Sequence, residues 1–576
     1  MTARGRTAVG LLVVAGALAV PAGASAHAAL VRTAPAASGT VNSPPARVSL
    51  TFSEPVEPRF AVVSVTDAAG KQETAAPPSR SETDVQTLEV PLRRVPHGWY
   101  LVYWRVISAD GHPVRGAFTF AVGPNPGPAP QFAVPSISET AATPRLIAAR
   151  FVVFLSVMAA IGLFVLRIAT ARPVVRRVRG TRLRSLSIAF GVCSLIALVA
   201  IPVYVVMSTA QFALRSAFDL AGVVPLLRAS AFGRSYVDLE LAFALFVVAA
   251  GLALWVDRPQ RERRSLAELL AVSGALAAAG ASLLIPSIAG HAGQTSPRGV
   301  AVPFDWIHLA AGSLWVGGLI GLLVLWRSLP APRRVAGLVV CVPRFSNTAF
   351  VSVMALIGAG TVGAVLHLPT LASLWETSYG QTLLVKIALL GGAMLLAAVN
   401  LLRNKPQLAA FNERPELGPA AAALLRKLVA GEVLLVAGAV LGSAVLTSLA
   451  PPPKALASTG NATVHVGPGP VTEVVERNGY RLEFHLSPNR AAVPNSFAVG
   501  ITRGGRPVRG ADVTTTFSSL DMEMGRQGYN LRETAPGLYV RSAPALVMVG
   551  RWGLTFEIVP PGTEPFTVVL VDRANG

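Results

Sequence analysis

Eight long apolar stretches between residues 145 and 450 constrain the fold of this chain more than any other feature of its sequence. Each is about 20 residues or longer, the length that an α-helix needs to cross the hydrocarbon core of a bilayer. Hydrophobic residues make up 52% of the chain and charged residues only 14%, a balance that excludes an ordinary soluble multidomain enzyme. The sequence therefore predicts an eight-helix transmembrane domain over residues 145–450. Its predicted spans are 146–168, 185–208, 236–256, 266–288, 303–326, 347–367, 382–402 and 428–449.

Lysine and arginine are concentrated in alternate loops between these spans. Loops that should all lie on one side hold 19 of these residues: 169–184, 257–265, 327–345 and 403–427. The three loops on the other side hold 4. Because positively charged loops stay in the cytoplasm, the pattern predicts a multi-pass plasma-membrane protein whose N-terminal and C-terminal domains are both extracytoplasmic. These loops also account for much of the net charge of +20, so we expect the lipid bilayer as a partner and no nucleic acid.

The first 26 residues have the pattern of a secretory signal peptide. Arg4 and Arg6 precede an apolar stretch at 9–20, and Ala24-Ser25-Ala26 has the small side chains of a cleavage site. Cleavage after this motif would make His27 the first residue of the mature protein. Its free α-amine and its imidazole could then chelate one metal ion, in a manner suited to Cu(II). The alternative is that His27 only marks the end of the signal.

Two β-rich regions flank the membrane segment. Residues 27–122 and 462–576 contain short alternating strands separated by Pro, Gly and Ser, a pattern typical of small β-sandwiches or barrels. Linkers at 123–144 and 451–461 separate them from the transmembrane domain. Both of the 2 cysteines fall in the membrane region, so we expect no disulfide in the exported parts. The predicted fold class is a multidomain membrane protein: an exported all-β domain, an eight-helix transmembrane domain and an exported C-terminal β-sandwich.

A short segment of the first β-region offers His27 further ligands. Asp110 and His112 flank Gly111, and residues two apart in an extended segment point to the same side. Together with His27 they would supply an amine, two imidazoles and a carboxylate, a ligand set that suits Cu(II). The alternative is a turn whose polar side chains face water.

Residues 27–122 resemble the CopC family of copper-binding domains. The resemblance rests on His27, on Val48-Ser49-Leu50-Thr51-Phe52-Ser53-Glu54-Pro55-Val56 and on Asp110-Gly111-His112-Pro113-Val114-Arg115-Gly116. It implies that His27, Asp110 and His112 bind Cu(II). Some members of that family carry a methionine-rich Cu(I) site, but residues 27–130 contain no Met. We therefore expect no separate Cu(I) site in this domain.

The membrane segment resembles the CopD family over about residues 285–390. The matching motifs are Gly290-His291-Ala292-Gly293, Asp305-Trp306-Ile307-His308 with the glycine-containing run to Leu319, Arg344-Phe345-Ser346, and Tyr379-Gly380-Gln381-Thr382 through Lys386. The order of the three parts resembles the YcnJ-type CopC–CopD fusions, which are linked to copper acquisition.

Three histidines near the outer ends of the predicted spans form a candidate copper path through the membrane domain: His291, His308 and His367. By the predicted topology, none of the chain's 8 histidines is cytoplasmic. An ionisable residue within a span is a functional-site hypothesis, and His308 follows Asp305 by three residues, which places both on one helical face. The alternative is that these histidines only form hydrogen bonds at helix ends.

Methionines and glycines deeper in the spans have two interpretations. Met158, Met354 and Met394 carry the soft sulfur that suits Cu(I), although ordinary packing would also explain each of them. Gly312 and the Gly317-Gly318 pair favour close helix packing over a chemical role.

The C-terminal region resembles YtkA-like or FixH-like β-sandwiches. The resemblance rests on Leu520-Asp521-Met522-Glu523-Met524-Gly525 and on the later Gly550-Arg551-Trp552. Met522 and Met524 would share one side of a strand and could bind Cu(I) as a thioether pair, joined by His465 or His485. The alternative is two ordinary surface or core methionines.

These features together predict a protein that binds copper and transports it across the plasma membrane, with import as the expected direction. Copper would be Cu(II) at the N-terminal domain and Cu(I) elsewhere, and a copper chaperone or a cuproenzyme would be its partner. The sequence has no P-loop motif, so ATP is not expected to drive transport. The same residues would also serve a resistance or sequestration protein that binds copper without transporting it. An oxidase built on His27 is disfavoured because Asp110 would occupy a copper position that oxygen needs, so we expect no enzyme activity.

Overall fold

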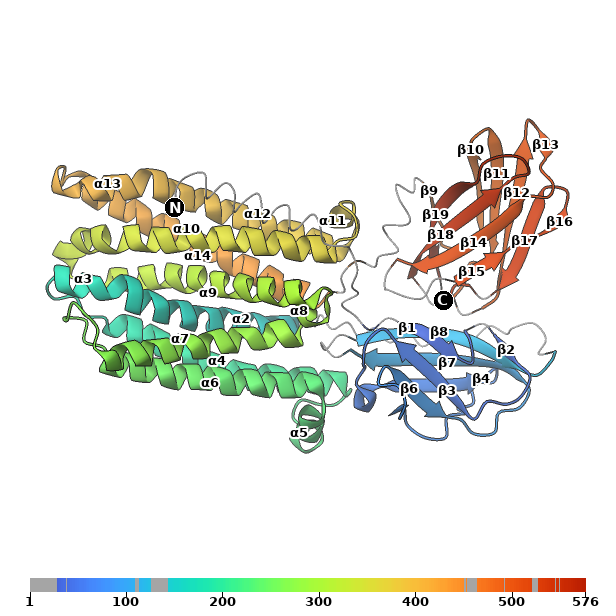
Figure 1. The fold of residues 1–576 in the computed structure, drawn as a ribbon, viewed down its shortest axis with the longest axis horizontal. Helices are drawn as coiled ribbons and strands as arrows, with labels where there is room; N and C mark the ends of the chain where they lie inside the picture. The colour runs from blue at the N-terminus through green and yellow to red at the C-terminus, as the bar shows by residue number, and fades with distance from the viewer. Residues whose placement is uncertain are drawn as a thin grey trace. The chain divides into compact units, whose positions relative to one another are not determined.

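The computed structural model describes residues 28, 30–37, 39–108, 113–125, 143–449, 452, 464–491, 493–520, 527–543, 545–547 and 550–575. The chain divides into two compact units. One is the helical membrane domain and the other contains the two β domains. Figure 1 labels the helices and strands of both units. The predicted fold class is thus confirmed.

The N-terminal β domain consists of two four-stranded sheets with the orders β1-β3-β6-β5 and β2-β8-β7-β4. The strands are β1 Leu30–Ala34, β2 Thr40–Val41, β3 Arg47–Phe52, β4 Val62–Asp67, β5 Ser79–Arg80, β6 Thr87–Pro91, β7 Gly98–Ile107 and β8 Pro113–Val122, and a short 3-10 turn, η1, covers Pro58–Phe60. Alternation along β3 buries every second residue, which directs Phe52 into the core. There the Phe52 ring meets Trp104 of β7 edge-on, with ring centroids 5.4 Å apart. The indole also lies so close to Gly116 of β8 that a Cβ there would be 2.6 Å from it, so glycine is needed at this position.

Eight helical segments of the described chain are long and apolar enough to cross a membrane, as the sequence predicts. They are α2–η2–α3 (Pro144–Val165, Leu166–Ala171 and Arg172–Arg177), α4 Arg184–Phe212, α6 Ala231–Val256, α7 Leu266–Ala289, α9 Arg298–Ser328, α10 Arg334–His367, α12–η4–α13 (Ser378–Val399, Asn400–Asn404 and Lys405–Ala409) and α14 Leu417–Leu446. Short helices and turns complete the domain: α5 Leu220–Ala229, α8 His291–Gln294, η3 Ala331–Arg333, α11 Ser373–Glu376 and η5 Ala410–Asn412.

Several helices extend well beyond the apolar spans that the sequence predicts. Helix α10 begins at Arg334, whereas its predicted span begins at residue 347. Hydropathy reports only the part of a helix that matches the hydrocarbon core, and helical hydrogen bonding continues beyond it toward water. The apolar helix α5 lies between the predicted spans 185–208 and 236–256, where the sequence predicts a loop.

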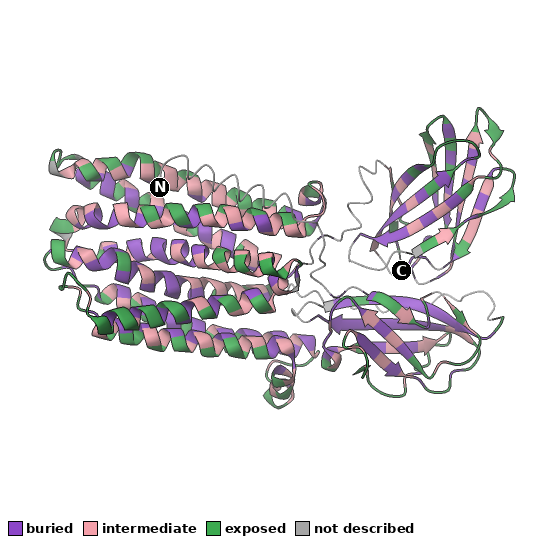
Figure 2. Ribbon diagram, in the orientation of Figure 1, coloured by how far each residue is buried: buried purple, intermediate pink, exposed green. Residues whose placement is uncertain are grey.

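Helices α2 and α9 are the most buried spans of the membrane domain. They cross where Gly162 of α2 meets Gly317 of α9: a Cβ on Gly317 would lie 2.5 Å from the Cα of Gly162 and 2.7 Å from the carbonyl oxygen of Ala159. Gly312 similarly makes room for the side chain of Met158. The predicted packing role of Gly312 and Gly317 is therefore confirmed, and Figure 2 shows how much of α2 and α9 is buried.

A buried ion network holds the end of the bundle where α2 passes into the π-helical turn η2. Asp257 accepts hydrogen bonds from Arg167 (2.8 Å) and Arg172 (3.0 Å), and all three side chains are at least nine-tenths buried. Glu268 completes a capping box with Ser265 at the start of α7. A second π-helical turn, η4, is anchored where Asn400 donates to Glu432 of α14 at 2.6 Å.

The C-terminal β domain is also a two-sheet structure. One sheet has the order β10-β11-β12-β17-β16, with β13 paired to β12, and the other has the order β15-β14-β18-β19-β9. The strands are β9 Val464–Val466, β10 Val471–Arg477, β11 Tyr480–Ser487, β12 Asn495–Arg503, β13 Arg506–Pro507, β14 Asp512–Ser519, β15 Gln527–Asn530, β16 Arg532–Ala535, β17 Leu538–Ala543, β18 Gly550–Val559 and β19 Phe566–Ala574. Phe497 of β12 and Phe517 of β14 join the sheets, with ring centroids 5.1 Å apart.

Candidate functional site

Two of the three predicted membrane histidines lie side by side. Helix α7 ends at Ala289, and after Gly290 the chain turns into α8, which begins with His291. His367 is the last residue of α10. Their ring centroids are 6.5 Å apart with an interplanar angle of 67°. The turn after α7 and the end of α10 thus bring together two imidazoles that are 76 positions apart in the sequence.

The hydrogen bonds of His367 determine which of its nitrogens can bind a metal. Nδ1 lies 2.7 Å from the carbonyl oxygen of Gly363 and must donate to it, since a carbonyl only accepts. In the neutral ring Nε2 then carries the lone pair. The Thr295 hydroxyl lies 3.2 Å from Nε2 and 2.7 Å from the carbonyl oxygen of His291, and its single proton can serve only one of them. Fixing one nitrogen through its neighbour is the usual way in which proteins prepare a histidine ligand.

His308 lies in α9 and faces α10 instead of this pair. Its ring packs against Gly360, where a Cβ would be 3.4 Å from Cε1. The ring lies near the backbone of Leu356, and among the described residues its buried Nδ1 has no hydrogen-bond partner. Gly360 therefore leaves room for the His308 ring beside the α10 backbone.

Asp305 links α9 to α7 and provides the negative charge of the site. Its Oδ2 accepts a 2.6 Å hydrogen bond from the hydroxyl of Ser287, which is fully buried. Asp305 also interacts electrostatically with His291 and with Lys386 of α12, and Lys386 in turn interacts with His308. Asp305 and His308 were predicted to share one helical face, but they contact different neighbouring helices. Lys386 is the residue that connects them electrostatically.

No group of three or more His, Cys, Asp or Glu side chains among the described residues is close enough to hold a metal ion. The structure thus provides a histidine pair and a separate His308 in place of one three-ligand centre. Met158 extends this series, because it packs on Gly312, one helical turn after His308. Met354 is 45% exposed and Met394 is half-buried, and nothing brings either of them to the histidines.

The predicted Cu(II) ligands His27, Asp110 and His112 lie outside the described residues, and so their roles stay predictions. The described residues that lie close to them in the sequence pair with residues 52–56. Leu30, at the start of β1, pairs with Phe52, and a short bridge joins Val56 to Ser108 just before the connection that contains Asp110 and His112. The buried carboxylate of Glu54 lies in this same segment.

The predicted Cu(I) pair Met522 and Met524 also lies outside the described residues, in the connection that follows β14. His485 is on the solvent-facing side of the other sheet, 3.2 Å from Glu483. His465 belongs to the same sheet as β14 but to β9, three strands away, or roughly 14 Å at the usual strand spacing.

Sequence reasoning missed Ser287, Thr295 and Lys386 as members of the membrane site. Lys386 had a usable signal, because a lysine inside a 20-residue apolar stretch is expensive unless it has a function or a partner. Ser287 and Thr295 had none, since hydroxyl residues are common in transmembrane helices and only the folded geometry shows where they donate.

Comparison with known proteins agrees with this organisation. A family model described as the CopC domain matches residues 30–123, and one described as Copper resistance protein D (CopD) matches residues 339–446, which include His367 and Lys386.

The chain is 25% identical over 548 residues to the copper transport protein CutJ of Bacillus subtilis, covering 92% of this chain and 93% of that protein. It is 39% identical over 98 residues to protein YobA of Escherichia coli (17% of this chain and 79% of YobA). It is 34% identical over 110 residues to copper resistance protein C of Xanthomonas campestris (18% and 84%). The YtkA- or FixH-like assignment of the C-terminal domain stays a prediction. The chain thus joins a CopC domain and a CopD domain in one polypeptide, and over most of its length it is similar to a copper transport protein.

Proposed function

We propose that this protein captures copper outside the cell and moves it through the transmembrane domain into the cytoplasm. The observation that carries the proposal is the His291–His367 pair, with ring centroids 6.5 Å apart and the Nε2 lone pair of His367 set by the bond from Nδ1 to Gly363. Imidazole nitrogen suits copper, and Cu(I) accepts a small number of ligands. The CopC and CopD domains and the copper transport protein CutJ among the relatives support the same function.

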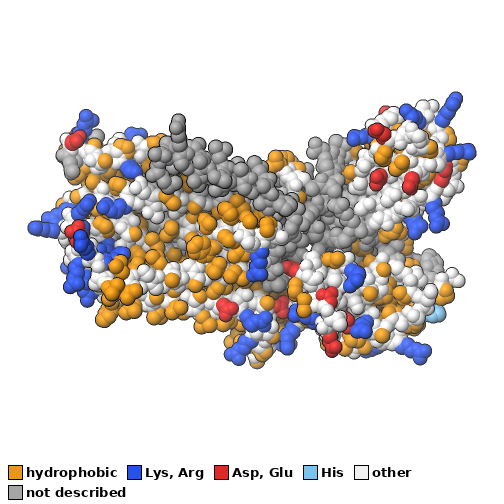
Figure 3. Space-filling model, viewed as in Figure 1, with side chains coloured by type: hydrophobic (Ala, Val, Ile, Leu, Met, Phe, Trp, Pro, Cys, Tyr) orange, Lys and Arg blue, Asp and Glu red, His pale blue; other side chains and the backbone are white. Residues whose placement is uncertain are grey.

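The distribution of charge supports an orientation in which the histidine pair faces outward. The loops with 19 Lys and Arg residues lie at the end of the bundle opposite to α8 and the end of α10. Figure 3 shows blue side chains gathered at that end and hydrophobic side chains over the helices between. Because basic loops remain in the cytoplasm, α8 would lie on the outer side, together with both β domains.

The membrane potential supplies a driving force for inward movement. A monovalent cation entering a cell that is negative inside gains about 2.3 kcal/mol per 100 mV. The sequence has no P-loop for ATP, and uptake of a cation along this potential needs none. We infer a transporter without enzyme activity, which would pass copper to a chaperone or a cuproenzyme in the cytoplasm.

The groups beyond the histidine pair suit the passage of one ion at a time. Asp305 would balance the charge of a copper ion arriving from His291, with which it already interacts electrostatically. Lys386 interacts with both Asp305 and His308, so its ammonium group would repel a second cation. The unpartnered Nδ1 of His308 and then the thioether of Met158 provide the next soft ligands along α9.

Uptake into vesicles tests transport directly. Full-length protein reconstituted with its histidine pair outward should accumulate Cu(I) in the lumen under an inside-negative potential. His291→Ala and His367→Ala should each lower the initial rate at least about tenfold, in line with the loss in metal affinity when a site loses a supporting group. His97→Gln, at an exposed position of the N-terminal domain, is the matched control and should transport normally. Tight copper binding without accumulation would overturn transport and favour sequestration.

The capture step has its own test. We propose that Cu(II) binds the amine and imidazole of His27 together with Asp110 and His112. One alanine inserted before the mature His27 displaces the amine and should change the Cu(II) electron paramagnetic resonance spectrum, as should Asp110→Ala. An unchanged spectrum in both variants, or a mature chain that does not begin at His27, would refute this ligand set.

A further inference from the structure

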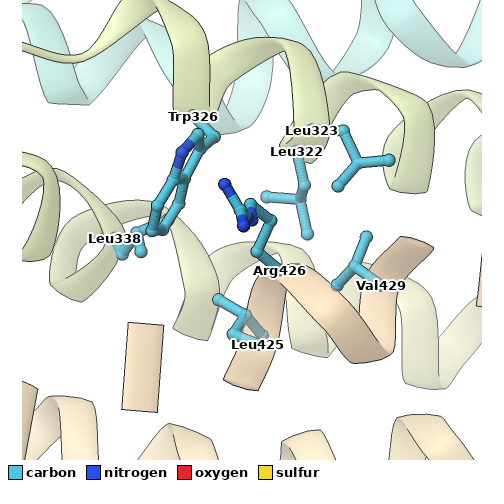
Figure 4. Close-up of a pocket in the computed structure, with 7 residues that line it drawn as sticks. All are labelled: Leu322, Leu323, Trp326, Leu338, Leu425, Arg426 and Val429. Atoms are coloured by element: carbon cyan, nitrogen blue, oxygen red, sulfur yellow. The ribbon is translucent and has the colours of Figure 1, made fainter. Parts of the chain in front are cut away.

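Two arginines lie against one tryptophan at the arginine-rich end of the bundle. The Cζ atom of Arg334, the first residue of α10, is 5.4 Å from the centroid of the Trp326 ring. The Cζ atom of Arg426 of α14 is 5.5 Å from it. Trp326 lies in the last turn of α9, so three helices contribute to the group, and Figure 4 shows Arg426 reaching toward the indole. Arg334, Arg426 and Trp326 are called the arginine–tryptophan cluster below.

The positive charge of this cluster is not balanced within the described part of the chain. Neither Arg334 nor Arg426 has a carboxylate within 4 Å among the described residues, and the buried Nε of Arg334 has no hydrogen-bond partner there. By contrast, Arg167 and Arg172 at the same end share Asp257. The N-terminus of the long helix α10 adds its own partial positive charge beside Arg334, and no side chain caps it. Both guanidinium groups lie within 5.5 Å of the centroid of one indole ring, so an anion bound beside them would offset their positive charge.

An apolar pocket adjoins the cluster. It is a small, shallow hollow, and Leu322, Leu338, Leu425 and Val429 line it beside Arg426 and Trp326 (Figure 4). Arg426 belongs to the membrane-spanning segment Gly418–Leu446, so a ligand that reaches it must enter the bilayer. Tryptophan near the end of a span is typical of the headgroup level of a membrane.

We propose that the arginine–tryptophan cluster binds an anionic phospholipid. The phosphate would accept hydrogen bonds from the guanidinium groups of Arg334 and Arg426. The glycerol and the first methylene groups of an acyl chain would cover the leucine-lined pocket. A phosphate-containing lipid satisfies the charge and the apolar surface at once, and basic pockets between transmembrane helices are suited to such headgroups. The bound lipid would join the ends of α9, α10 and α14.

Quenching of Trp326 by brominated lipids tests the proposal. The full-length protein is reconstituted in phosphatidylcholine vesicles with increasing amounts of brominated phosphatidylglycerol or brominated phosphatidylcholine. The signal of Trp326 is the difference between the unaltered protein and Trp326→Phe, since the chain has 8 tryptophans. Brominated phosphatidylglycerol should quench this signal at a lower mole fraction, with a preference of about fivefold contributed by each arginine.

Matched variants separate the proposed site from general charge attraction. Arg334→Gln and Arg426→Gln should each lower the preference about fivefold, and Arg426→Lys, which keeps a cation, should retain most of it. Arg263→Gln changes an exposed arginine at the same end of the bundle and should have no effect. Equal quenching by the two lipids, or an equal loss with Arg263→Gln, would overturn the proposal. So would millimolar inorganic phosphate that abolishes the preference, because the site would then bind free phosphate.

Discussion

The crossing of α2 and α9 leaves no room for a side chain, and the substitution Gly317→Ala tests this directly. A Cβ at Gly317 would lie 2.5 Å from the Cα of Gly162, whereas carbon atoms in favourable contact are about 3.5–4.0 Å apart. The obstructing atoms are backbone, so no rotamer change can relieve the overlap, and the helices must separate by about 1 Å. A gap of this size forfeits about a quarter to a half of each dispersion contact along the crossing. We expect a cost of about 1–3 kcal/mol.

The matched control is Gly358→Ala in α10, where an added Cβ would meet nothing within 4 Å. Alanine favours the helix over glycine by about 1 kcal/mol, so this variant should be slightly more stable than the unaltered protein. Thermal unfolding of the purified protein in detergent, followed by tryptophan fluorescence, should show Tm moving in opposite directions by a few degrees. Gly162→Ala should cost at least as much as Gly317→Ala, because its Cβ would also overlap the carbonyl oxygen of Ser313. The double variant should lose less than the sum, because both substitutions act on one helix crossing. Equal shifts in Tm for Gly317→Ala and Gly358→Ala would refute the reasoning.

Three further predictions concern other parts of the chain. Asp257→Asn should lower stability by about 3–5 kcal/mol, because it leaves the buried guanidinium group of Arg167 without a carboxylate and Arg172 with only Glu268, 3.9 Å away. A fall in Tm no larger than that of Glu262→Gln, whose side chain is 84% exposed, would contradict this. Burial raises the pKa of Asp572 in the C-terminal domain to about 6, above its unfolded value, so its contribution to stability is fully present below about pH 4 and is lost as the pH rises through 6. In pH-dependent unfolding of the full-length protein, Asp572→Asn should therefore gain stability relative to the unaltered chain between pH 4 and 7, and a constant difference would exclude this titration. Gly360→Leu should displace His308 and lower copper uptake about tenfold. Gly360→Ala should transport normally, because its Cβ would lie 3.4 Å from Cε1 of His308, an acceptable contact. Equal uptake by both variants would remove His308 from the path.

The sequence was sufficient to predict the membrane domain because the bilayer imposes a length and an apolar composition on every span. That constraint is local, so it can be read without knowing which helices touch. The ends of the helices were predicted less well: α10 continues through Arg344 to Arg334, since polar residues at the headgroup level remain helical. The alternating strands of the β domains were likewise predictable, because burial of one face repeats every second residue, as in β3.

The membrane site was predictable only in part. Motifs identified His291, His308 and His367, but their grouping depends on which helix ends meet. His308 faces α10 because residue 360 is a glycine, and His367 meets His291 because the chain turns at Gly290 directly after α7. Neither contact follows from helical periodicity. The hydroxyl groups of Ser287 and Thr295 become meaningful only once their distances to Asp305 and His367 are known.

The hydrogen bonds that join the helices at the histidine end are unequal in length. Helix α7 is held to α9 twice, by Ser287 to Asp305 at 2.6 Å and by the Trp306 indole to the Gly280 carbonyl at 2.9 Å. The contact from Thr295 to His367 is longer, at 3.2 Å, and its hydroxyl proton already has a closer acceptor. A ligand that takes the Nε2 lone pair of His367 would therefore displace only a weak contact at the end of α10 and would leave the hydrogen bond from Thr295 to His291 in place.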